Sequence, residues 1–295
     1  MKAGKYSRNG QIGVFLVRSD GGLVDAQHLA SNASPEQIRE VARLASRGDS
    51  GFCAALPLIE SYLSEKPDSL DHASTLPSDL KFEPPTRPQS FLCVGLNYKD
   101  HAAESKMELP KAPLLFAKTG NAISAHYRDV AIPPNCTHFD FEAELAVVMG
   151  KRCRNVSRED AAGYIAGYTC GNDLSARDFQ FGDGQWYRGK SCDGFGPLGP
   201  WLVTPAEIGD PQSLGIRLRI NGTTMQDSNT CNLVFDVPAL VEYASNYMTL
   251  DPGDVILTGT PPGVGFSRKP PIFLKSGDVV EVEIERIGVL VNRIR

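Results

Sequence analysis

The sequence lacks any long apolar run. No stretch approaches the roughly 18 consecutive apolar residues that a membrane-spanning helix needs. Residues 1–17 are basic, but they lack the apolar core of a signal peptide and pass directly into an alternating strand pattern. Low-complexity tracts are also absent, and the composition of 41% hydrophobic and 22% charged residues is ordinary for a globular protein. We therefore expect no membrane partner.

Positive charge is not in excess either. The formal net charge is −5, which argues against nucleic acid as the main partner and means that an anionic substrate would need a local positive site. The seven cysteines form no C-x-x-C pair, so neither a zinc ribbon nor a disulfide framework is indicated. These features predict a reducing compartment, the cytoplasm.

A chain of 295 residues exceeds the size at which a single core usually stops growing, so we expect one large domain and a smaller one. Residues 1–74 predict a small α+β domain, with a strand over 11–17, a capped helix over 34–46 and a further helical pattern over 56–66. The polar, proline-rich residues 75–89 are typical of a linker.

From residue 90 to residue 295 the signals are mostly β. Residues 214–226 alternate into an Asn-Gly hairpin turn, and Gly-Asp pairs twice precede β-branched runs. Helical patterns are few, over 157–168 and 236–248. Many short strands with turn punctuation predict a mostly β (α+β) fold, a sandwich, roll or barrel-like domain.

The stretch "DFEAELAVVMG", residues 140–150, places two acids at one end of a strand pattern. Residues i and i+2 share a face only on a strand, so Glu142 and Glu144 would lie about 6.6 Å apart along it. At that separation two carboxylates repel by about 2.5 kcal/mol at an effective dielectric of 20, and a divalent cation would reverse the sign. The alternative is an ordinary solvated outer face.

A third acid, Asp173, follows a short apolar segment in "GYTCGNDLSARDFQ". An aspartate in front of a helical segment is most often an N-cap. The local pattern alone leaves a cap and a functional carboxylate both open.

Six motifs in a fixed order carry a resemblance to a known family: "CVGLNYKDHAAE", "LFAKTGNAI", "DFEAELAVVMG", "GYTCGNDLSARDFQ", "QWYRGKSCDGFGPLGPW" and "LTGTPPGVG". Together they resemble the fumarylacetoacetate hydrolase family over residues 90–295. The resemblance implies a β-roll or sandwich catalytic domain that binds a divalent cation, Mg²⁺ or Mn²⁺ and in some members Ca²⁺. It also implies a small-molecule substrate of the 2-oxo or diketo acid class and a homodimer.

The same resemblance implies roles for particular residues. The metal ligands would be Glu142, Glu144 and Asp173, an all-oxygen set that suits hard cations. Lys190 would stabilise an enolate, and His101 with Glu104, at i and i+3, would serve as the acid–base pair. The substrate-binding residues would be Lys118, Arg177, Gln180 and Thr260.

Three functions fit these residues. We favour hydrolysis of a C–C bond in an acylpyruvate or related 2,4-diketo acid, because the presence of His101 and Glu104 argues against a pure isomerase. The alternative keeps the site but gives decarboxylation, or keto–enol or double-bond isomerisation, of a 2-oxo acid such as oxaloacetate or 2-hydroxyhepta-2,4-diene-1,7-dioate. A non-catalytic binding protein on the same scaffold is the third, and the presence of His101 and Lys190 argues against it.

Overall fold

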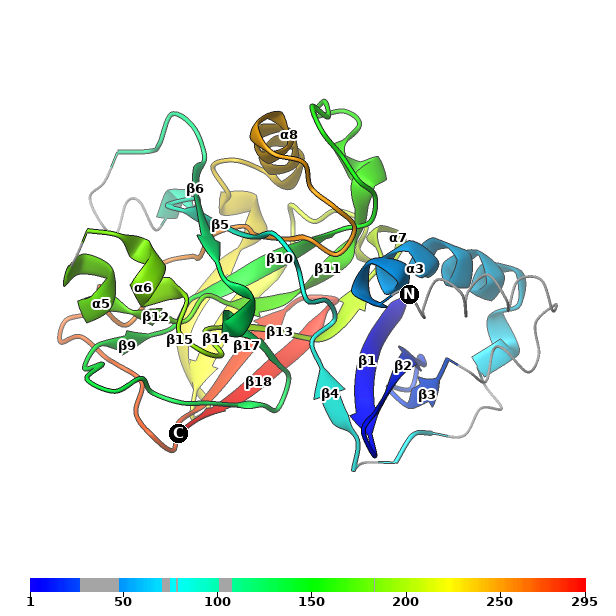
Figure 1. Ribbon diagram of the computed structural model, residues 1–295, viewed down its shortest axis with the longest axis horizontal. Helices are drawn as coiled ribbons and strands as arrows, with labels where there is room; N and C mark the ends of the chain where they lie inside the picture. Colours follow the sequence, from blue (N-terminus) through cyan, green and yellow to red (C-terminus); the bar gives the residue numbers. More distant parts are fainter. Residues whose placement is uncertain (27–47, 71–74, 78, 101–107, 183) are drawn as a thin grey trace.

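The structure is a computed structural model that describes residues 1–26, 48–70, 75–77, 79–100, 108–182 and 184–295 (Figure 1). Strands outnumber helices, which confirms the mostly β prediction. The α-helices among these residues are α3 (Gly48–Glu65), α5 (Arg177–Gly182), α6 (Trp186–Lys190), α7 (Pro205–Ile208) and α8 (Val237–Tyr247). In the described part of the chain, no helix is both long enough and apolar enough to cross a bilayer.

The larger sheet has eleven strands, in the order β3-β2-β1-β13-β11-β10-β16-β5-β6, with β4 paired to β1 and β7 to β13. Its members are β1 (Lys2–Arg8), β2 (Gln11–Val17), β3 (Leu23–Asp25), β4 (Lys81–Glu83), β5 (Phe91–Gly95), β6 (Leu114–Lys118), β7 (Ile123–Ala125), β10 (Ala143–Met149), β11 (Ile165–Asn172), β13 (Gly196–Val203) and β16 (Val255–Leu257).

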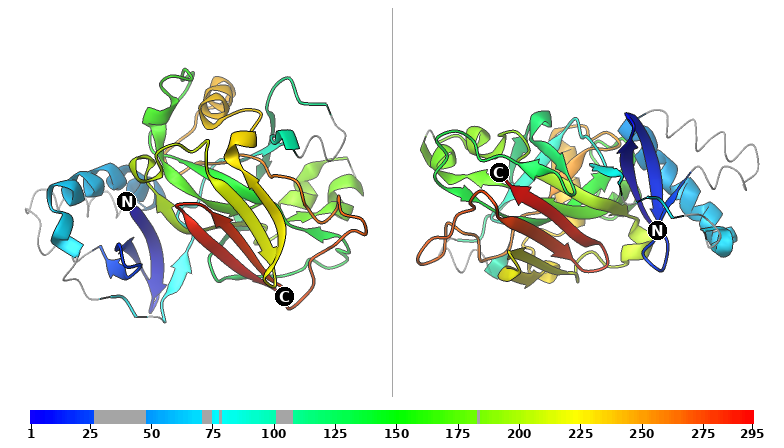
Figure 2. Two further views of the ribbon diagram at one scale, coloured as in Figure 1. Left: turned by 180° about the vertical axis from the view of Figure 1, so that it is seen from behind. Right: turned by 90° about the horizontal axis from the view of Figure 1, so that it is seen from below.

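A five-stranded sheet packs against one face of the larger one, as the view from behind shows (Figure 2). A separate two-stranded ribbon pairs β12 with β9. The five strands, in the order β15-β14-β17-β18-β8, are β15 (Thr223–Asn229), β14 (Gly215–Ile220), β17 (Val279–Ile284), β18 (Gly288–Ile294) and β8 (Asp129–Val130), and the ribbon strands are β12 (Ser175–Ala176) and β9 (Phe139–Asp140).

Strand β10 is buried on both faces, which explains its nearly continuous apolar sequence. Leu145 and Val147 belong to the core between the two sheets, whereas Ala146 and Val148 belong to a second core that includes α3. Because side chains alternate along a strand, Glu144 continues the face of Ala146 and Val148. One face of β10 therefore carries core residues at its C-terminal end and an acid of the carboxylate cluster at its N-terminal end.

The N-terminal strands extend the sheet that carries β10. Ala3 on β1 pairs with Leu202 on β13, and α3 contributes Phe52 and Leu56 to the second core. In Figure 1 the blue N-terminal strands and α3 lie at one end of the sheet. The division into residues 1–74, 75–89 and 90–295 stays a prediction.

Several local predictions are confirmed and one is wrong. The strand over 11–17, the helical pattern over 56–66 and the hairpin at Asn221-Gly222 are present, with both turn residues at positive φ. The helix expected over 157–168 is wrong, because only a 3-10 turn forms at Ala161–Tyr164 and β11 begins at Ile165. A Cβ at Gly167 would lie 2.4 Å from the Val203 carbonyl oxygen, so glycine there permits the close β11–β13 approach that overrides helical periodicity. The helix expected over 34–46 falls outside the described residues.

Candidate metal centre

Three carboxylates converge where β10 and β11 meet. One oxygen each from Glu142, Glu144 and Asp173 lies within 4.8 Å of the others. Glu142 immediately precedes β10, Glu144 lies on it, and Asp173 immediately follows its antiparallel neighbour β11. The backbone fixes this corner, because Asp173 N donates to Glu142 O at 2.9 Å and Glu142 N donates to the side-chain Oδ1 of Asn172 at 3.1 Å.

The structure excludes both alternative interpretations of these acids, the solvated outer face and the helix N-cap. A solvated outer face would expose them, but Glu142, Glu144 and Asp173 are only 7%, 1% and 0% exposed. The Asp173 carboxylate does not cap a helix; it accepts a hydrogen bond from Lys190 Nζ at 2.8 Å. Burial of three carboxylates within a few ångströms requires compensating positive charge.

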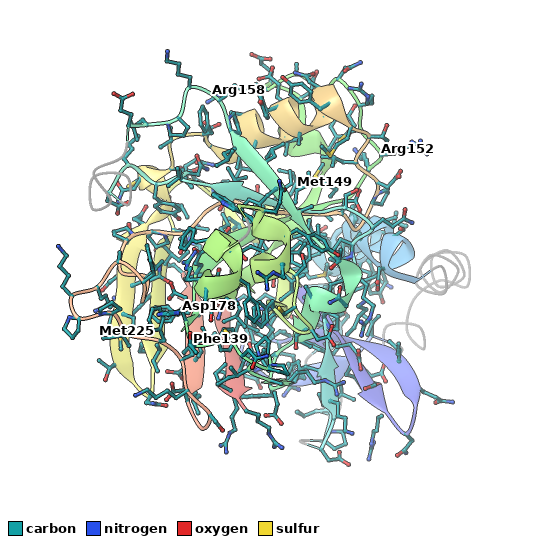
Figure 3. The ribbon with its side chains drawn as sticks, turned by 60° about the vertical axis from the view of Figure 1, so that its left-hand side comes forward. Phe139, Met149, Arg152, Arg158, Asp178 and Met225 are labelled. Atoms are coloured by element: carbon teal, nitrogen blue, oxygen red, sulfur yellow. The ribbon has the colours of Figure 1, made fainter. Side chains whose placement is uncertain are left out.

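Three buried cations surround the carboxylates. Lys190 Nζ, at the end of α6, donates to Glu142 Oε2 at 2.7 Å as well as to Asp173. Lys118 Nζ, at the end of β6, lies 2.6 Å from Asp173 Oδ1. Arg177 Nη2, at the start of α5, donates to Glu142 Oε1 at 2.5 Å. Figure 3 faces this side of the molecule, with the green helices α5 and α6 in front of the sheets and Asp178 of α5 labelled.

The ion pairs shift the pKa values of two of these groups. Burial alone would raise the pKa of Glu142, but the charges of Lys190 and Arg177 outweigh burial and hold that pKa well below its usual range. Burial would lower the pKa of Lys190, but Asp173 and Glu142 outweigh it and raise that pKa. Lys190 is therefore a permanently protonated hydrogen-bond donor at neutral pH.

Glu144 differs from the other two acids. Its Oε2 accepts a hydrogen bond from Gly259 N at 2.6 Å, and the described residues place no Lys or Arg within ion-pair distance of it. Burial first, and then the charges of Asp173 and Glu142, raise the pKa of Glu144 well above its usual value. The charge of Lys190 acts in the opposite direction but does not offset these effects, so Glu144 is the acid of the three without a cation at ion-pair distance in the described residues.

The donor set fits a divalent cation. Oxygen donors from three converging carboxylates suit a hard ion such as Mg²⁺, Mn²⁺ or Ca²⁺. Within the described residues Asp173 Oδ1 accepts no hydrogen bond of acceptable geometry, and its one charged contact is the Lys118 ammonium at 2.6 Å. A dication would also place a positive charge in direct contact with Glu144.

Asp140 joins the site although the sequence assigned it no role. Its Oδ2 accepts from Arg177 Nε at 2.8 Å, and its Oδ1 accepts from Gly265 N at 2.7 Å. A fully buried carboxylate thus ties the arginine that holds Glu142 to the loop after β16. The sequence signal was its place in the alternate set Asp140, Glu142, Glu144.

The other predicted residues are placed as follows. Arg177 Nη1 donates to Gln180 Oε1 at 3.0 Å, so its guanidinium is occupied by Asp140, Glu142 and Gln180. Thr260, on the loop after β16, accepts a hydrogen bond from Gln226 Nε2 at 2.8 Å. His101 and Glu104 lie outside the described residues, so the acid–base pair stays a prediction.

These observations define a protein with a mostly β fold and a buried cluster of three carboxylates that could hold a divalent cation. The model of the fumarylacetoacetate (FAA) hydrolase C-terminal domain matches residues 90–295. The chain belongs to this family, and the resemblance read from the six motifs is confirmed.

Curated relatives extend the similarity. The mitochondrial oxaloacetate tautomerase FAHD2A of Bos taurus is 49% identical over 213 residues, which cover 72% of this chain and 68% of the relative. The mitochondrial oxaloacetate tautomerase fahd2 of Xenopus laevis is 43% identical over 284 residues, which cover 96% of this chain and 85% of the relative.

Solved structures share the whole fold. The fumarylacetoacetate hydrolase of Exiguobacterium antarcticum has a TM-score of 0.83 at 31% identity, covering 100% of this chain and 99% of that one. The maleylpyruvate hydrolase of Sphingobium sp. SYK-6, in complex with manganese(II) and pyruvate, has a TM-score of 0.76 at 28% identity, covering 100% and 98%. The family is enzymatic, and the names of the relatives favour the isomerase alternative over the C–C hydrolase.

Proposed function

We propose that this chain is a divalent-metal-dependent tautomerase that interconverts the keto and enol forms of a 2-oxo diacid of the oxaloacetate class. The observation that carries the proposal is Lys190, an ammonium group that is 2% exposed and lies between two carboxylates of a converging set of three. Among the reactions that an enolate-stabilising site could perform, the names of relatives called oxaloacetate tautomerases support this one.

The charges of the site favour a dianionic substrate once a metal is present. Four buried carboxylates, including Asp140, face three buried cations, which leaves one negative charge. A dication turns this balance to one positive charge. The acidic chain would thereby gain the local positive site that an anionic substrate requires.

The proposed ligands of the metal are Glu142, Glu144 and Asp173. When bound, the ion would polarise the 2-oxo group of the substrate and make the adjacent C–H more acidic. Lys190 stays protonated and donates a hydrogen bond to the oxygen on which enolate charge develops, an interaction that is strongest in the transition state. Gln180 and Thr260 would donate to the remaining substrate oxygens.

Proton transfer at the carbon needs a base other than Lys190, because Asp173 and Glu142 raise the pKa of that lysine. We assign this role to His101, with Glu104 orienting its imidazole. In a tautomerase His101 would take the proton from the carbon and pass it to the enolate oxygen, and in the reverse direction it would carry the proton of the enol oxygen back to the carbon, so no water is activated. The presence of both residues is therefore compatible with isomerisation as well as with hydrolysis.

The test follows the enol absorbance of oxaloacetate with the Mn²⁺-loaded protein, with pyruvate and CO₂ measured in parallel. Acceleration of the absorbance change with an intact carbon skeleton is the expected result. Equal rates with and without protein, or stoichiometric CO₂ release, would refute tautomerisation. Glu144→Gln provides the control for free-metal catalysis, because the same metal concentration then meets a protein with a weakened site.

Hydrolysis of an acylpyruvate is the second candidate. It is favoured by the shared fold with maleylpyruvate hydrolase, whose structure holds manganese and pyruvate. Release of pyruvate from acylpyruvate without CO₂ would identify this activity. The proposal also includes magnesium as the physiological ion, a homodimeric assembly and a cytoplasmic location. The names of several relatives contain the word mitochondrial, which makes a mitochondrial location the alternative.

A further inference from the structure

A glutamine outside the carboxylate cluster connects the start of β10 to the loop after β16. Gln226 on β15 is 1% exposed and makes three hydrogen bonds. Its Oε1 accepts from Ala143 N, between the two glutamates, at 2.9 Å. Its Nε2 donates to Pro261 O at 2.8 Å and to Thr260 Oγ1 at 2.8 Å. Figure 3 labels the neighbouring Met225 on the yellow strand β15.

The orientation of this side-chain amide is fixed by two backbone groups of opposite kind. The Ala143 N–H can only donate, so it must face the amide oxygen. The Pro261 carbonyl can only accept, so it must face the amide nitrogen. A flipped amide would lose both hydrogen bonds inside the core, and each loss leaves a buried polar group unsatisfied.

The fixed amide dictates the role of the Thr260 hydroxyl. Because Nε2 carries only donors, Thr260 Oγ1 must act as the acceptor toward Gln226. The single hydroxyl proton must then point elsewhere, and the described residues offer it no acceptor. Thr260 directly follows Gly259, whose N–H binds Glu144, so the proton is available beside the proposed metal centre.

We propose that Gln226 is a positioning residue that fixes the Thr260 hydroxyl as a hydrogen-bond donor to a carboxylate or 2-oxo oxygen of the ligand. The inference rests on the proposed function, since it takes the same site and the same class of oxo acid. A hydroxyl locked in this way favours an anionic acceptor over a ligand that presents an N–H or O–H donor. Gln226 does not touch the ligand; it acts through Thr260.

The test is a double-mutant cycle on the binding of oxalate, a dianion with vicinal carboxylate oxygens, to the Mn²⁺-saturated protein by calorimetry. Thr260→Val should weaken oxalate binding about 10- to 100-fold, the range for a lost hydrogen bond to a charged group. Gln226→Met should weaken it about 5- to 20-fold, because the hydroxyl becomes free to rotate. In the double variant the effect should stay within about twofold of Thr260→Val alone.

Multiplicative effects in the double variant would refute the proposal, because Gln226 would then act independently of the hydroxyl. No effect of Thr260→Val or of Gln226→Met on oxalate affinity would also refute it. If Gln226→Met does not fold, Gln226→Glu keeps the acceptor for Ala143 N, and its added charge is present in both backgrounds and cancels in the cycle.

Arg268→Met is the matched structural control. Arg268 donates to Gly263 O at 3.0 Å and to Met225 O, so it ties the same loop to the same strand without contacting Thr260. It should lower Tm but leave oxalate affinity within about twofold of wild type. Weakening as large as that of Gln226→Met would show that loop placement is responsible and refute the proposal. Tautomerisation by the wild-type protein is scored separately, so failure of that activity leaves the oxalate cycle interpretable.

Discussion

Asp140 and Arg177 form a buried ion pair, with Oδ2 and Nε 2.8 Å apart, and the same guanidinium also pairs with Glu142, a proposed metal ligand. Asp140 Oδ1 accepts from Gly265 N. The pair therefore joins three segments that are distant in sequence. Its integrity should govern both the stability of the fold and the shape of the site.

Asp140→Asn should lower the free energy of unfolding by about 2–4 kcal/mol, because it removes one partner of a buried charge pair while Arg177 retains Glu142. Denaturant unfolding of the metal-free protein measures this change. Asp227→Asn is the control, since Asp227 pairs with Arg217 on the surface and should cost less than about 1 kcal/mol. Equal losses in the two variants would contradict the importance of the buried pair.

Glu144→Gln should affect metal affinity and stability in opposite directions. The amide oxygen can still accept the Gly259 N–H, and a neutral group is easier to bury than a carboxylate. The metal-free protein should therefore be at least as stable as wild type. Mn²⁺ affinity measured by calorimetry should fall about 10- to 100-fold, the range found when the surroundings of a metal site are altered. Unchanged affinity would remove Glu144 from the ligand set.

Metal binding should depend on pH through Glu144. Its pKa in the metal-free protein is raised by burial and then by Asp173 and Glu142, so the group carries a proton at pH values where an ordinary glutamate does not. A cation must displace that proton, and affinity should rise about tenfold per pH unit below the raised pKa and level off above it. Calorimetry in two buffers of different ionisation enthalpy should detect about one proton released per ion. Glu144→Gln should abolish this release.

Lys190→Met should separate chemistry from metal binding. Turnover should fall about 10²- to 10³-fold, because the donor to the developing enolate is lost. Mn²⁺ affinity should not fall, since the variant removes a cation that competes for Glu142 and Asp173. Steady-state kinetics and calorimetry on one preparation give both quantities. Parallel losses would indicate that Lys190 holds the ligands in place and has no separate role in the reaction.

Protonation of His126 should lower the free energy of unfolding at mildly acidic pH. Burial lowers its pKa from 6.5 to about 4, and its Nδ1 accepts a hydrogen bond from Val291 N, which protonation would destroy. The unfolded chain binds the proton first, so stability falls as pH drops from about 6.5 to about 4, by about 3 kcal/mol in total. Urea unfolding across this window measures the slope. His126→Asn keeps an acceptor for Val291 N and should flatten this part of the profile; an unchanged slope would assign it to other groups.

Local patterns predicted several strands, the hairpin and the proximity of Glu142 and Glu144, because alternation and turn chemistry are short-range properties. Even here tertiary pairing changed details: Glu142 lies just before β10 and not within it, and β11 replaces an expected helix. Asp173 could be assigned only through the resemblance, since its local pattern is that of a cap.

The supporting groups could not be predicted in the same way. Asp140 binds Gly265, and Gln226 binds Ala143 and Thr260, through hydrogen bonds between residues 125, 83 and 34 positions apart. No periodicity links such positions. From the sequence, Gln226 could be predicted only as a residue of a hairpin strand. The role that we propose for it depends on its backbone partners, which fix the orientation of its amide.

The pairing of β1 with β13 has a practical consequence for shortened forms of the chain. A fragment that starts at residue 90 would leave the Leu202 region of β13 without its neighbour and would uncover the apolar surface now under Phe52 and Leu56. Unpaired strand edges beside apolar surface promote intermolecular pairing. Expression of the family-matched region alone should therefore yield aggregates, even though that region holds every proposed ligand of the metal.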